Sequence, residues 1–228
     1  MLGAVIFDFD GVIVDTETPL FTAWQRVYEH FGVEPIALAE WADSLGRHDD
    51  DPELLDPLAR LQAAYDCPLD VEHVQDIRRA LRDHAVDQLP TQPGVVALLD
   101  SADALGLPVA IASSSPPDWI ERHLGQRGLL ERFPIVSCAG DGVPGKPDPA
   151  VYLRAADALH VDARTCLAFE DSPHGTTAAK RAGMACVAVP TTLGASLDFS
   201  HADRVVATLD DVTLPDWHPS DAPSASRS

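Results

Sequence analysis

The feature that most constrains the fold is a regular alternation between short apolar runs and longer amphipathic stretches. The apolar runs have the length of buried strands and occupy residues 4–7, 109–112, 135–137, 167–169, 186–189 and 204–207. The amphipathic stretches have the length of helices and occupy residues 94–105, 118–126, 150–159 and 175–182. Strands that alternate with helices form a parallel sheet with helices on both faces. The pattern therefore predicts an α/β fold with a doubly wound, Rossmann-like core.

The long segment between the first two expected strands breaks this alternation. It contains helical patterns only, at residues 19–31, 36–44, 52–65 and 71–88. We therefore expect a helical cap at residues 17–89, inserted into a catalytic core formed by residues 1–16 and 90–213. Thr16 is expected to cap the first of these helices. The tail at residues 214–228 is rich in Pro, Ser and Asp, a composition typical of disorder.

Charge and hydropathy exclude several classes of partner. The formal net charge of −20 argues against nucleic acid, whose phosphates require a basic surface. No apolar run approaches the roughly 18 residues that a membrane span needs. The N-terminus lacks the basic segment and following apolar segment of a secretion signal, so we expect a cytoplasmic protein. We also expect a monomer or a weak homo-oligomer. The four cysteines lack Cys-x-x-Cys spacing, so the sequence favours neither disulfide bonds nor a zinc site.

Two carboxylates stand at the end of the first expected strand. Asp8 and Asp10 are two residues apart, and side chains alternate along an extended chain, so both can point toward one place. Gly11 lets the backbone turn sharply after them. One carboxylate could attack while the other carries a proton, or both could help to hold a metal. The alternative is a solvated acidic turn, which the apolar strand leading directly into it disfavours.

Polar residues also follow the later strands. Ser113, Ser114 and Ser115 follow the second expected strand, and Glu170-Asp171-Ser172 follows the fourth. Lys146 lies in a proline-rich loop after the third strand. Ligands of open parallel sheets bind beyond the carboxyl ends of the strands, so acids, hydroxyls and one ammonium are expected at a single edge.

This set of groups suits phosphoryl transfer. A phosphate dianion repels a carboxylate nucleophile, and a divalent cation neutralises both. Asp8, Glu170 and Asp171 offer the oxygen ligands that Mg²⁺ prefers. Lys146 and Ser113 would hold the phosphoryl oxygens. Asp8 would form an aspartyl-phosphate, and Asp10 would act as the acid and then the base.

Four motifs in this order resemble those of the haloacid dehalogenase superfamily. They are residues 8–17 (DFDGVIVDTE), Ser113, residues 145–149 (GKPDP) and residues 169–172 (FEDS). The resemblance extends over about residues 3–207. It is closest to the branch with a helical cap after the first motif, which contains β-phosphoglucomutase and many sugar-phosphate phosphatases.

The resemblance implies a role for each motif residue. Asp8 is the implied nucleophile and Asp10 the acid/base. Mg²⁺ is implied to bind Asp8, the backbone carbonyl of Asp10, Glu170 and Asp171. Ser113 and Lys146 are the implied phosphate ligands. Members that displace halide typically lack the second aspartate, so Asp10 favours the phosphoryl branch.

Two further residues are candidates whose alternatives stay open. Ser114, next to Ser113, is a phosphate-binding candidate, or it caps the following helix. Arg47 stands in a Gly-Arg-His segment similar to one in which related caps present an arginine to the substrate. Arg47 could contact a distal anionic group, or it could form a surface ion pair with the neighbouring aspartates. In the mutase a histidine follows the first motif, and this chain has Leu20 there.

The sequence thus predicts a Mg²⁺-dependent phosphatase, a phosphoric monoester hydrolase that acts on a small phosphorylated metabolite. A sugar or polyol phosphate is the expected substrate. One alternative is a β-phosphoglucomutase-like sugar-phosphate mutase, which would form the same intermediate. A second alternative is a non-catalytic protein that binds a metal or a metabolite and has kept the fold.

Overall fold

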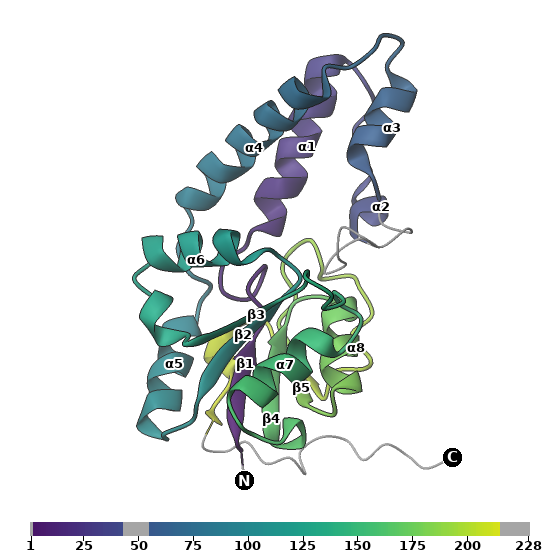
Figure 1. Cartoon of the computed structure of the whole chain (residues 1–228). Helices are drawn as coiled ribbons and strands as arrows, with labels where there is room; N and C mark the ends of the chain where they lie inside the picture. Colours follow the sequence, from purple (N-terminus) through teal and green to yellow (C-terminus); the bar gives the residue numbers. More distant parts are fainter. Residues whose placement is uncertain (1, 43–54, 215–228) are drawn as a thin grey trace, which may run out of the picture.

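A six-stranded sheet forms the centre of the molecule, as the computed structural model in Figure 1 shows. The structure describes residues 2–42 and 55–214. All neighbouring strands pair in parallel, in the order β3-β2-β1-β4-β5-β6. The strands are β1 (Ala4–Phe7), β2 (Val109–Ser113), β3 (Ile135–Cys138), β4 (Cys166–Glu170), β5 (Ala185–Ala188) and β6 (Arg204–Val205). The predicted parallel, Rossmann-like α/β core is confirmed.

The strand order reverses beside β1. From β1 the chain adds β2 and β3 on one side and then returns to place β4, β5 and β6 on the other. Val5 of β1 is in register with Val109 of β2 and with Leu167 of β4. Such a reversal leaves a crevice beyond the carboxyl ends of the strands, where ligands of open sheets bind. The residues that follow β1 and β4 therefore meet at this crevice.

Helices cover both faces of the sheet and bury two apolar clusters. Val5 and Phe7 belong to the cluster under α5 (Val95–Ala104) and α6 (Pro117–Gln126). Ala4 and Ile6 belong to the cluster under α7 (Ala150–Ala158) and α8 (Pro173–Arg181). This division follows from the alternation of side chains along a strand. Because both faces of β1 are buried, its sequence is apolar throughout.

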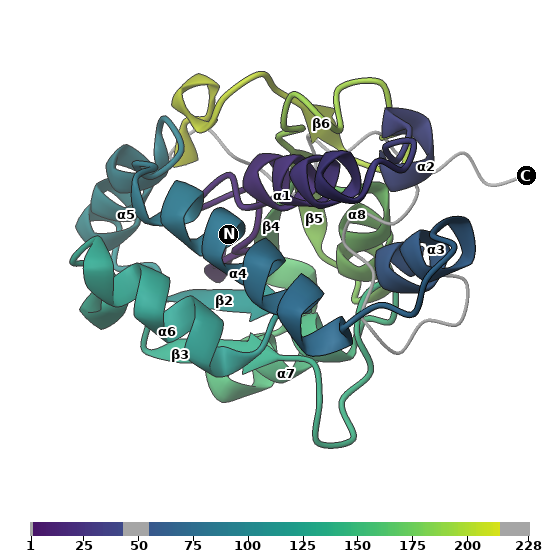
Figure 2. The ribbon, with the colours of Figure 1, turned by 90° about the horizontal axis from the view of Figure 1, so that it is seen from above.

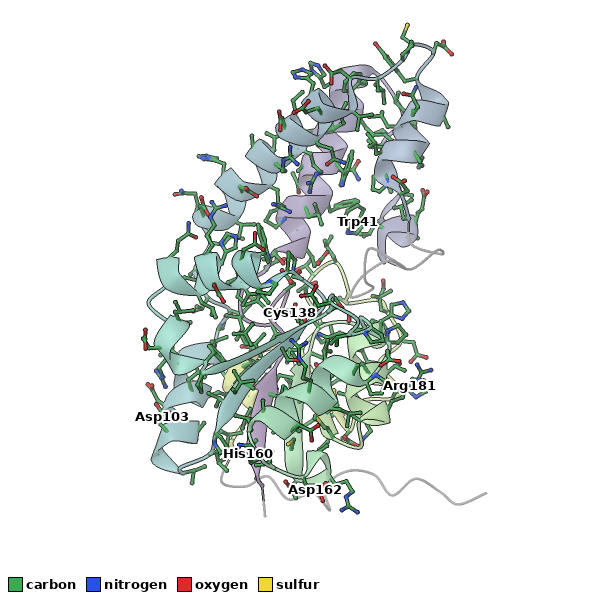
Figure 3. The ribbon with its side chains drawn as sticks, viewed as in Figure 1. Trp41, Asp103, Cys138, His160, Asp162 and Arg181 are labelled. Carbon is green, nitrogen blue, oxygen red and sulfur yellow. The ribbon has the colours of Figure 1, made fainter. Side chains whose placement is uncertain are left out.

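Four further helices lie above the carboxyl edge of the sheet, and Figure 2 shows them from above. They are α1 (Glu17–Phe31), α2 (Leu38–Ala42), α3 (Pro57–Ala64) and α4 (Val71–Asp87). α1 packs along α4, and the group buries an apolar cluster of its own that includes Trp24, Tyr28 and Leu61. Figure 3 shows Trp41 in this group, whereas His160 and Asp162 lie near the opposite edge of the sheet.

Two helices of the inserted segment begin later than the sequence predicts. The helix expected from residue 36 begins at Leu38, and the helix expected from residue 52 begins at Pro57. The Asp56 carboxylate accepts a hydrogen bond of 2.9 Å from the Ala59 backbone N–H and so caps α3. Pro57 then occupies the first helical position, where its missing N–H has no effect.

Two short linkers connect the upper helices to the sheet, and they are joined to each other. The Gln92 backbone N–H donates to the Ile13 carbonyl at 2.8 Å, and its side-chain amide donates to the Gly11 carbonyl at 3.1 Å. Arg127 at the end of α6 donates to the carbonyls of Val86 and Leu89, at 2.7 Å each. Within residues 2–42 and 55–214, no helix combines the length and the apolar character that a membrane crossing requires.

Candidate active site

A cavity of about 940 Å³ lies between the carboxyl edge of the sheet and the upper helices. Its walls include the predicted site residues Asp8, Asp10, Ser113, Ser114, Lys146 and Asp171. Glu170 is fully buried beside Asp8 and Lys146. The structure therefore brings the predicted core residues together from β1, β2, β4 and the loop after β3. Arg47 lies outside the residues that the structure describes.

The Lys146 ammonium stands between two carboxylates. Lys146 Nζ is 2.5 Å from Asp8 Oδ1 and 2.6 Å from Glu170 Oε1, and all three side chains are buried. The two carboxylates raise the pKa of Lys146 above its ordinary value, against the effect of burial. The lysine therefore stays charged and brings a fixed positive charge to the Asp8 carboxylate.

The carboxylates around this ammonium fit a divalent cation. Ligand oxygens of Asp8, Glu170 and Asp171 all lie within 4.8 Å of one another. Three carboxylates against one ammonium leave a negative excess that burial makes costly. Burial, together with the charges of Asp8 and Glu170, raises the pKa of Asp171 well above its ordinary value. Asp171 Oδ2 is buried and has no hydrogen-bond partner among the described residues. An all-oxygen set with one unpaired oxygen suits Mg²⁺.

Two glycines make room for these carboxylates. A Cβ atom on Gly11 would lie 1.9 Å from Asp171 Oδ2, and one on Gly175 would lie 1.9 Å from Glu170 Oε2. Gly11 also has a φ of +83°, in the left-handed region that favours glycine. Glycine is thus required at both positions for the carboxylates to approach the backbone closely.

Tyr152 supports Glu170 and was not predicted from the sequence. Its hydroxyl donates to Glu170 Oε1, and the Lys146 ammonium lies 5.3 Å from the centre of its ring. Tyr152 is fully buried on α7, in an amphipathic stretch that predicts an inward-facing position. The pattern does not reveal the partner of the hydroxyl, because Glu170 lies on another element.

Asp10 is held by several donors. Thr16 Oγ1 donates to Asp10 Oδ1 at 2.6 Å, and Trp119 Nε1 donates to the same oxygen at 3.0 Å. Ser115 Oγ donates to Asp10 Oδ2 at 2.6 Å. Thr16 occupies the N-cap position of α1, but its side chain makes no capping bond, so the expected capping role is wrong. The first turn of α1 is instead capped by Asp15, which accepts from the Thr18 N–H at 3.0 Å.

The two candidate phosphate-binding serines differ in their contacts. Ser113 Oγ accepts from the Ser115 backbone N–H at 3.0 Å and lies 3.5 Å from Asp10 Oδ2. Ser114 Oγ accepts from the Lys146 backbone N–H at 3.3 Å. Ser113 therefore faces the acid/base candidate, whereas Ser114 holds the lysine loop in place.

Comparison with known proteins agrees with this fold. The haloacid dehalogenase-like hydrolase family matches residues 5–189. The chain therefore belongs to the haloacid dehalogenase-like hydrolases.

Two relatives in this family are named as phosphatases. The chain is 37% identical over 214 residues to a Bacillus subtilis (strain 168) protein named "Putative phosphatase YhcW", covering 94% of this chain and 95% of that protein. It is 31% identical over 214 residues to hexitol phosphatase B of Escherichia coli (strain K12), covering 93% and 95%. The crystal structure of CbbY from Rhodobacter sphaeroides in complex with phosphate shares the fold, with a TM-score of 0.73, 24% identity and coverage of 92% and 96%. The prediction of a phosphoric monoester hydrolase is confirmed.

Proposed function

We propose that this enzyme is a Mg²⁺-dependent phosphatase that hydrolyses a sugar or polyol phosphate through an aspartyl-phosphate on Asp8. The main support for the proposal is that two carboxylates with different surroundings lie at one cavity. Asp8 is held by an ammonium beside the acidic cluster, whereas Asp10 is held by neutral donors. These surroundings suit a nucleophile and an acid/base, respectively.

The first half-reaction transfers the phosphoryl group to the enzyme. Lys146 and the Ser113 hydroxyl bind the phosphoryl oxygens, and Lys146 offsets their charge next to Asp8. An Asp8 oxygen attacks phosphorus as the bond to the substrate oxygen breaks. Protonated Asp10 donates its proton to that oxygen, so the product leaves as a neutral alcohol. Asp8, Glu170, Asp171 and the Asp10 carbonyl would hold Mg²⁺, which would neutralise the charge of the phosphoryl oxygens.

The second half-reaction restores the enzyme. Asp10, now a carboxylate, takes a proton from a water molecule as the water oxygen attacks phosphorus. The bond between phosphorus and the Asp8 oxygen breaks, inorganic phosphate leaves, and Asp10 is protonated again. One residue thus serves as acid and then as base, which requires its carboxyl group to stay close to the phosphoryl group throughout.

The cavity suits a small hydrophilic substrate. Its volume of about 940 Å³ is within the usual range for small-molecule sites. Gln75 and Arg78 of α4 provide polar groups on the wall opposite the sheet, and Trp24 provides an apolar surface. A polyhydroxylated phosphate ester needs such a mixed wall, and the similarity to hexitol phosphatase B supports the same substrate class. We propose residues 17–89 as a cap domain that closes over the bound substrate, with Arg47 as a further substrate contact.

A mutase is less well supported than a phosphatase. Leu20 occupies the place where β-phosphoglucomutase has a histidine, and it lies on the cavity wall. An apolar side chain there cannot exchange a proton or donate a hydrogen bond to a second sugar hydroxyl. Water is therefore the favoured acceptor of the phosphoryl group.

The test is phosphate release from a panel of sugar and polyol phosphates, with and without Mg²⁺. We expect Mg²⁺-dependent release that Asp8→Asn abolishes, and a phosphorylated Asp8 peptide in acid-quenched enzyme by mass spectrometry. A label on another residue would overturn the assignment of the nucleophile. Isomerisation of glucose 1-phosphate with a bisphosphate primer, without phosphate release, would establish the mutase instead. Ligand binding without turnover across the panel would establish the non-catalytic alternative.

A further inference from the structure

We infer that Trp119 is a positioning residue for Asp10, and that Arg82 of α4 holds the Trp119 indole in place. The inference rests on the proposed function, because it assigns Trp119 a role through the acid/base. Through these contacts, α4 influences the orientation of the group that donates the proton to the substrate.

The contacts of Trp119 set it apart from the other tryptophan side chains on the cavity wall. Trp119 stands in the first turn of α6, and its Nε1–H donates to Asp10 Oδ1 at 3.0 Å. The Arg82 guanidinium carbon lies 4.1 Å from the centre of the indole ring. The His123 ring, one turn further along α6, lies 4.1 Å away at an interplanar angle of 72°. The indole is therefore enclosed between a cation of α4 and a ring of its own helix.

Arg82 is itself fixed by an ion-pair network between α4 and α6. Arg82 Nε donates to Asp83 Oδ1 at 2.8 Å, and Arg122 of α6 donates to Asp83 Oδ2 at 3.3 Å. Arg122 also binds both oxygens of Asp87, at 3.0 and 2.8 Å. These pairs are partly exposed, so their individual contributions to stability are small. Their geometric effect is to connect the position of α4 to the orientation of the indole.

The donors around Asp10 fix the orientation of its carboxyl group. Trp119 Nε1 and Thr16 Oγ1 both donate to Asp10 Oδ1, whereas Ser115 Oγ contacts Oδ2. An indole N–H is a rigid donor that cannot accept a hydrogen bond. Trp119 thus helps to hold the carboxyl group in one orientation, with Oδ2 directed toward Ser113 and Ser115.

A comparison of two aryl phosphates tests the role of Trp119. Phenyl phosphate has a poorer leaving group than p-nitrophenyl phosphate, so its cleavage depends more on proton donation. With Mg²⁺ present, we expect Trp119→Phe to lower kcat/KM for phenyl phosphate about tenfold more than for p-nitrophenyl phosphate. Trp24→Phe is the control: Trp24 is a cavity tryptophan of α1 whose ring packs edge-on against Tyr28, and its variant should keep the ratio of the two values. An equal loss for both substrates in Trp119→Phe would reduce Trp119 to a packing role and overturn the inference.

Asp10→Asn separates this inference from the proposed function. The ratio is kcat/KM for phenyl phosphate divided by kcat/KM for p-nitrophenyl phosphate. If Asp10→Asn leaves this ratio unchanged, the proposed role of Asp10 fails. If Asp10→Asn lowers the ratio and Trp119→Phe does not, only the inference fails. A lowered ratio in both variants supports both.

A measurement without turnover tests the contribution of α4. In ¹⁵N-labelled protein, the indole N–H signal of Trp119 is assigned with Trp119→Phe, and its shift and solvent exchange are followed. We expect Asp10→Asn and Arg82→Ala each to shift this signal and to speed its exchange. Arg79→Ala is the matched control, because Arg79 is a half-exposed arginine of the same helix that pairs with Asp76. An unchanged signal in Arg82→Ala would contradict the role of α4.

Discussion

At the residue scale, the site depends on glycine as much as on its carboxylates. Gly11 combines a left-handed backbone with direct contact to the Asp171 carboxylate. Gly32, at the end of α1, is left-handed too, with a φ of +67°, but a Cβ atom there would meet nothing within 4 Å. Substitutions at these two positions therefore distinguish the effect of backbone strain from the effect of lost space at the acidic cluster.

We predict that Gly11→Ala lowers the affinity for Mg²⁺ at least about tenfold, whereas Gly32→Ala leaves it unchanged. Both variants should lose about 1–2 kcal/mol of stability, because an L-residue is strained in the left-handed region. Only Gly11→Ala displaces Asp171. Calorimetric titration with MgCl₂ gives the affinities, and urea unfolding gives the stabilities. Equal affinities in the two variants would show that Asp171 needs no such clearance to bind the metal.

Chain position and residue type were enough to predict Asp8, Lys146, Glu170 and Asp171 as neighbours. Each lies at or beyond the carboxyl end of a strand, and parallel pairing brings these ends to one edge of the sheet. The donors to Asp10 could not be found in this way. Trp119 reaches Asp10 from the first turn of α6, and only the packing of α6 determines which way its indole points.

At the element scale, capping explains where the sequence prediction of the helices fails. Periodicity reports which residues share a face, and it does not mark the point at which a helix starts. Asp56 and Pro57 provide that signal for α3, and Asp70 provides it for α4 by accepting from the His73 N–H at 3.1 Å. Such local hydrogen bonds can be tested one at a time.

We predict that Asp70→Ala destabilises the protein by about 1 kcal/mol, the usual effect of losing an N-cap side chain. Asp66→Ala is the control, since Asp66 is an exposed aspartate of the same loop that caps no described helix. Urea unfolding at neutral pH measures both variants. A loss in Asp66→Ala as large as that in Asp70→Ala would attribute the effect to charge rather than to capping.

The contact between α4 and α6 also predicts a dependence of stability on pH. Burial lowers the pKa of His123, and the neighbouring Arg122 and Arg127 lower it further, against the opposing effects of the Gln126 hydrogen bond and of Asp87. The folded state therefore binds the proton less readily than the unfolded chain, whose histidine pKa is about 6.5. The stability contributed by neutral His123 is complete above this value and is lost as the pH falls toward the folded pKa.

We therefore expect His123→Gln to reduce the loss of unfolding free energy between pH 7.5 and pH 5.5. His73→Gln, which removes an exposed histidine of α4, should leave that loss unchanged. Urea unfolding at the two pH values measures the difference. The same loss in His123→Gln as in the unmodified protein would show that His123 does not contribute to acid sensitivity.

At the scale of the whole molecule, the proposed Mg²⁺ site would link folding to binding of the cation. The cluster consists of Asp8 after β1 together with Glu170 and Asp171 at the end of the neighbouring strand β4, so it exists only when the sheet is formed. A ligand that binds only the folded state stabilises it, by about 2.7 kcal/mol when its concentration is one hundred times its dissociation constant. Mg²⁺ should therefore raise the melting temperature even without a substrate.

We predict that this shift disappears in Asp171→Asn, which removes one carboxylate charge from the cluster. Without Mg²⁺ the same variant should melt at or above the temperature of the unmodified protein, because the neutral amide relieves repulsion from Asp8 and Glu170. Asp162→Asn is the control. This exposed carboxylate pairs with Arg164. Asp162 lies near the opposite edge of the sheet, where Figure 3 labels it, and its variant should keep the full shift. Thermal melts with MgCl₂ or EDTA measure all three proteins. An undiminished Mg²⁺ shift in Asp171→Asn would place the cation elsewhere, and the neutralisation assigned to this cluster would be wrong.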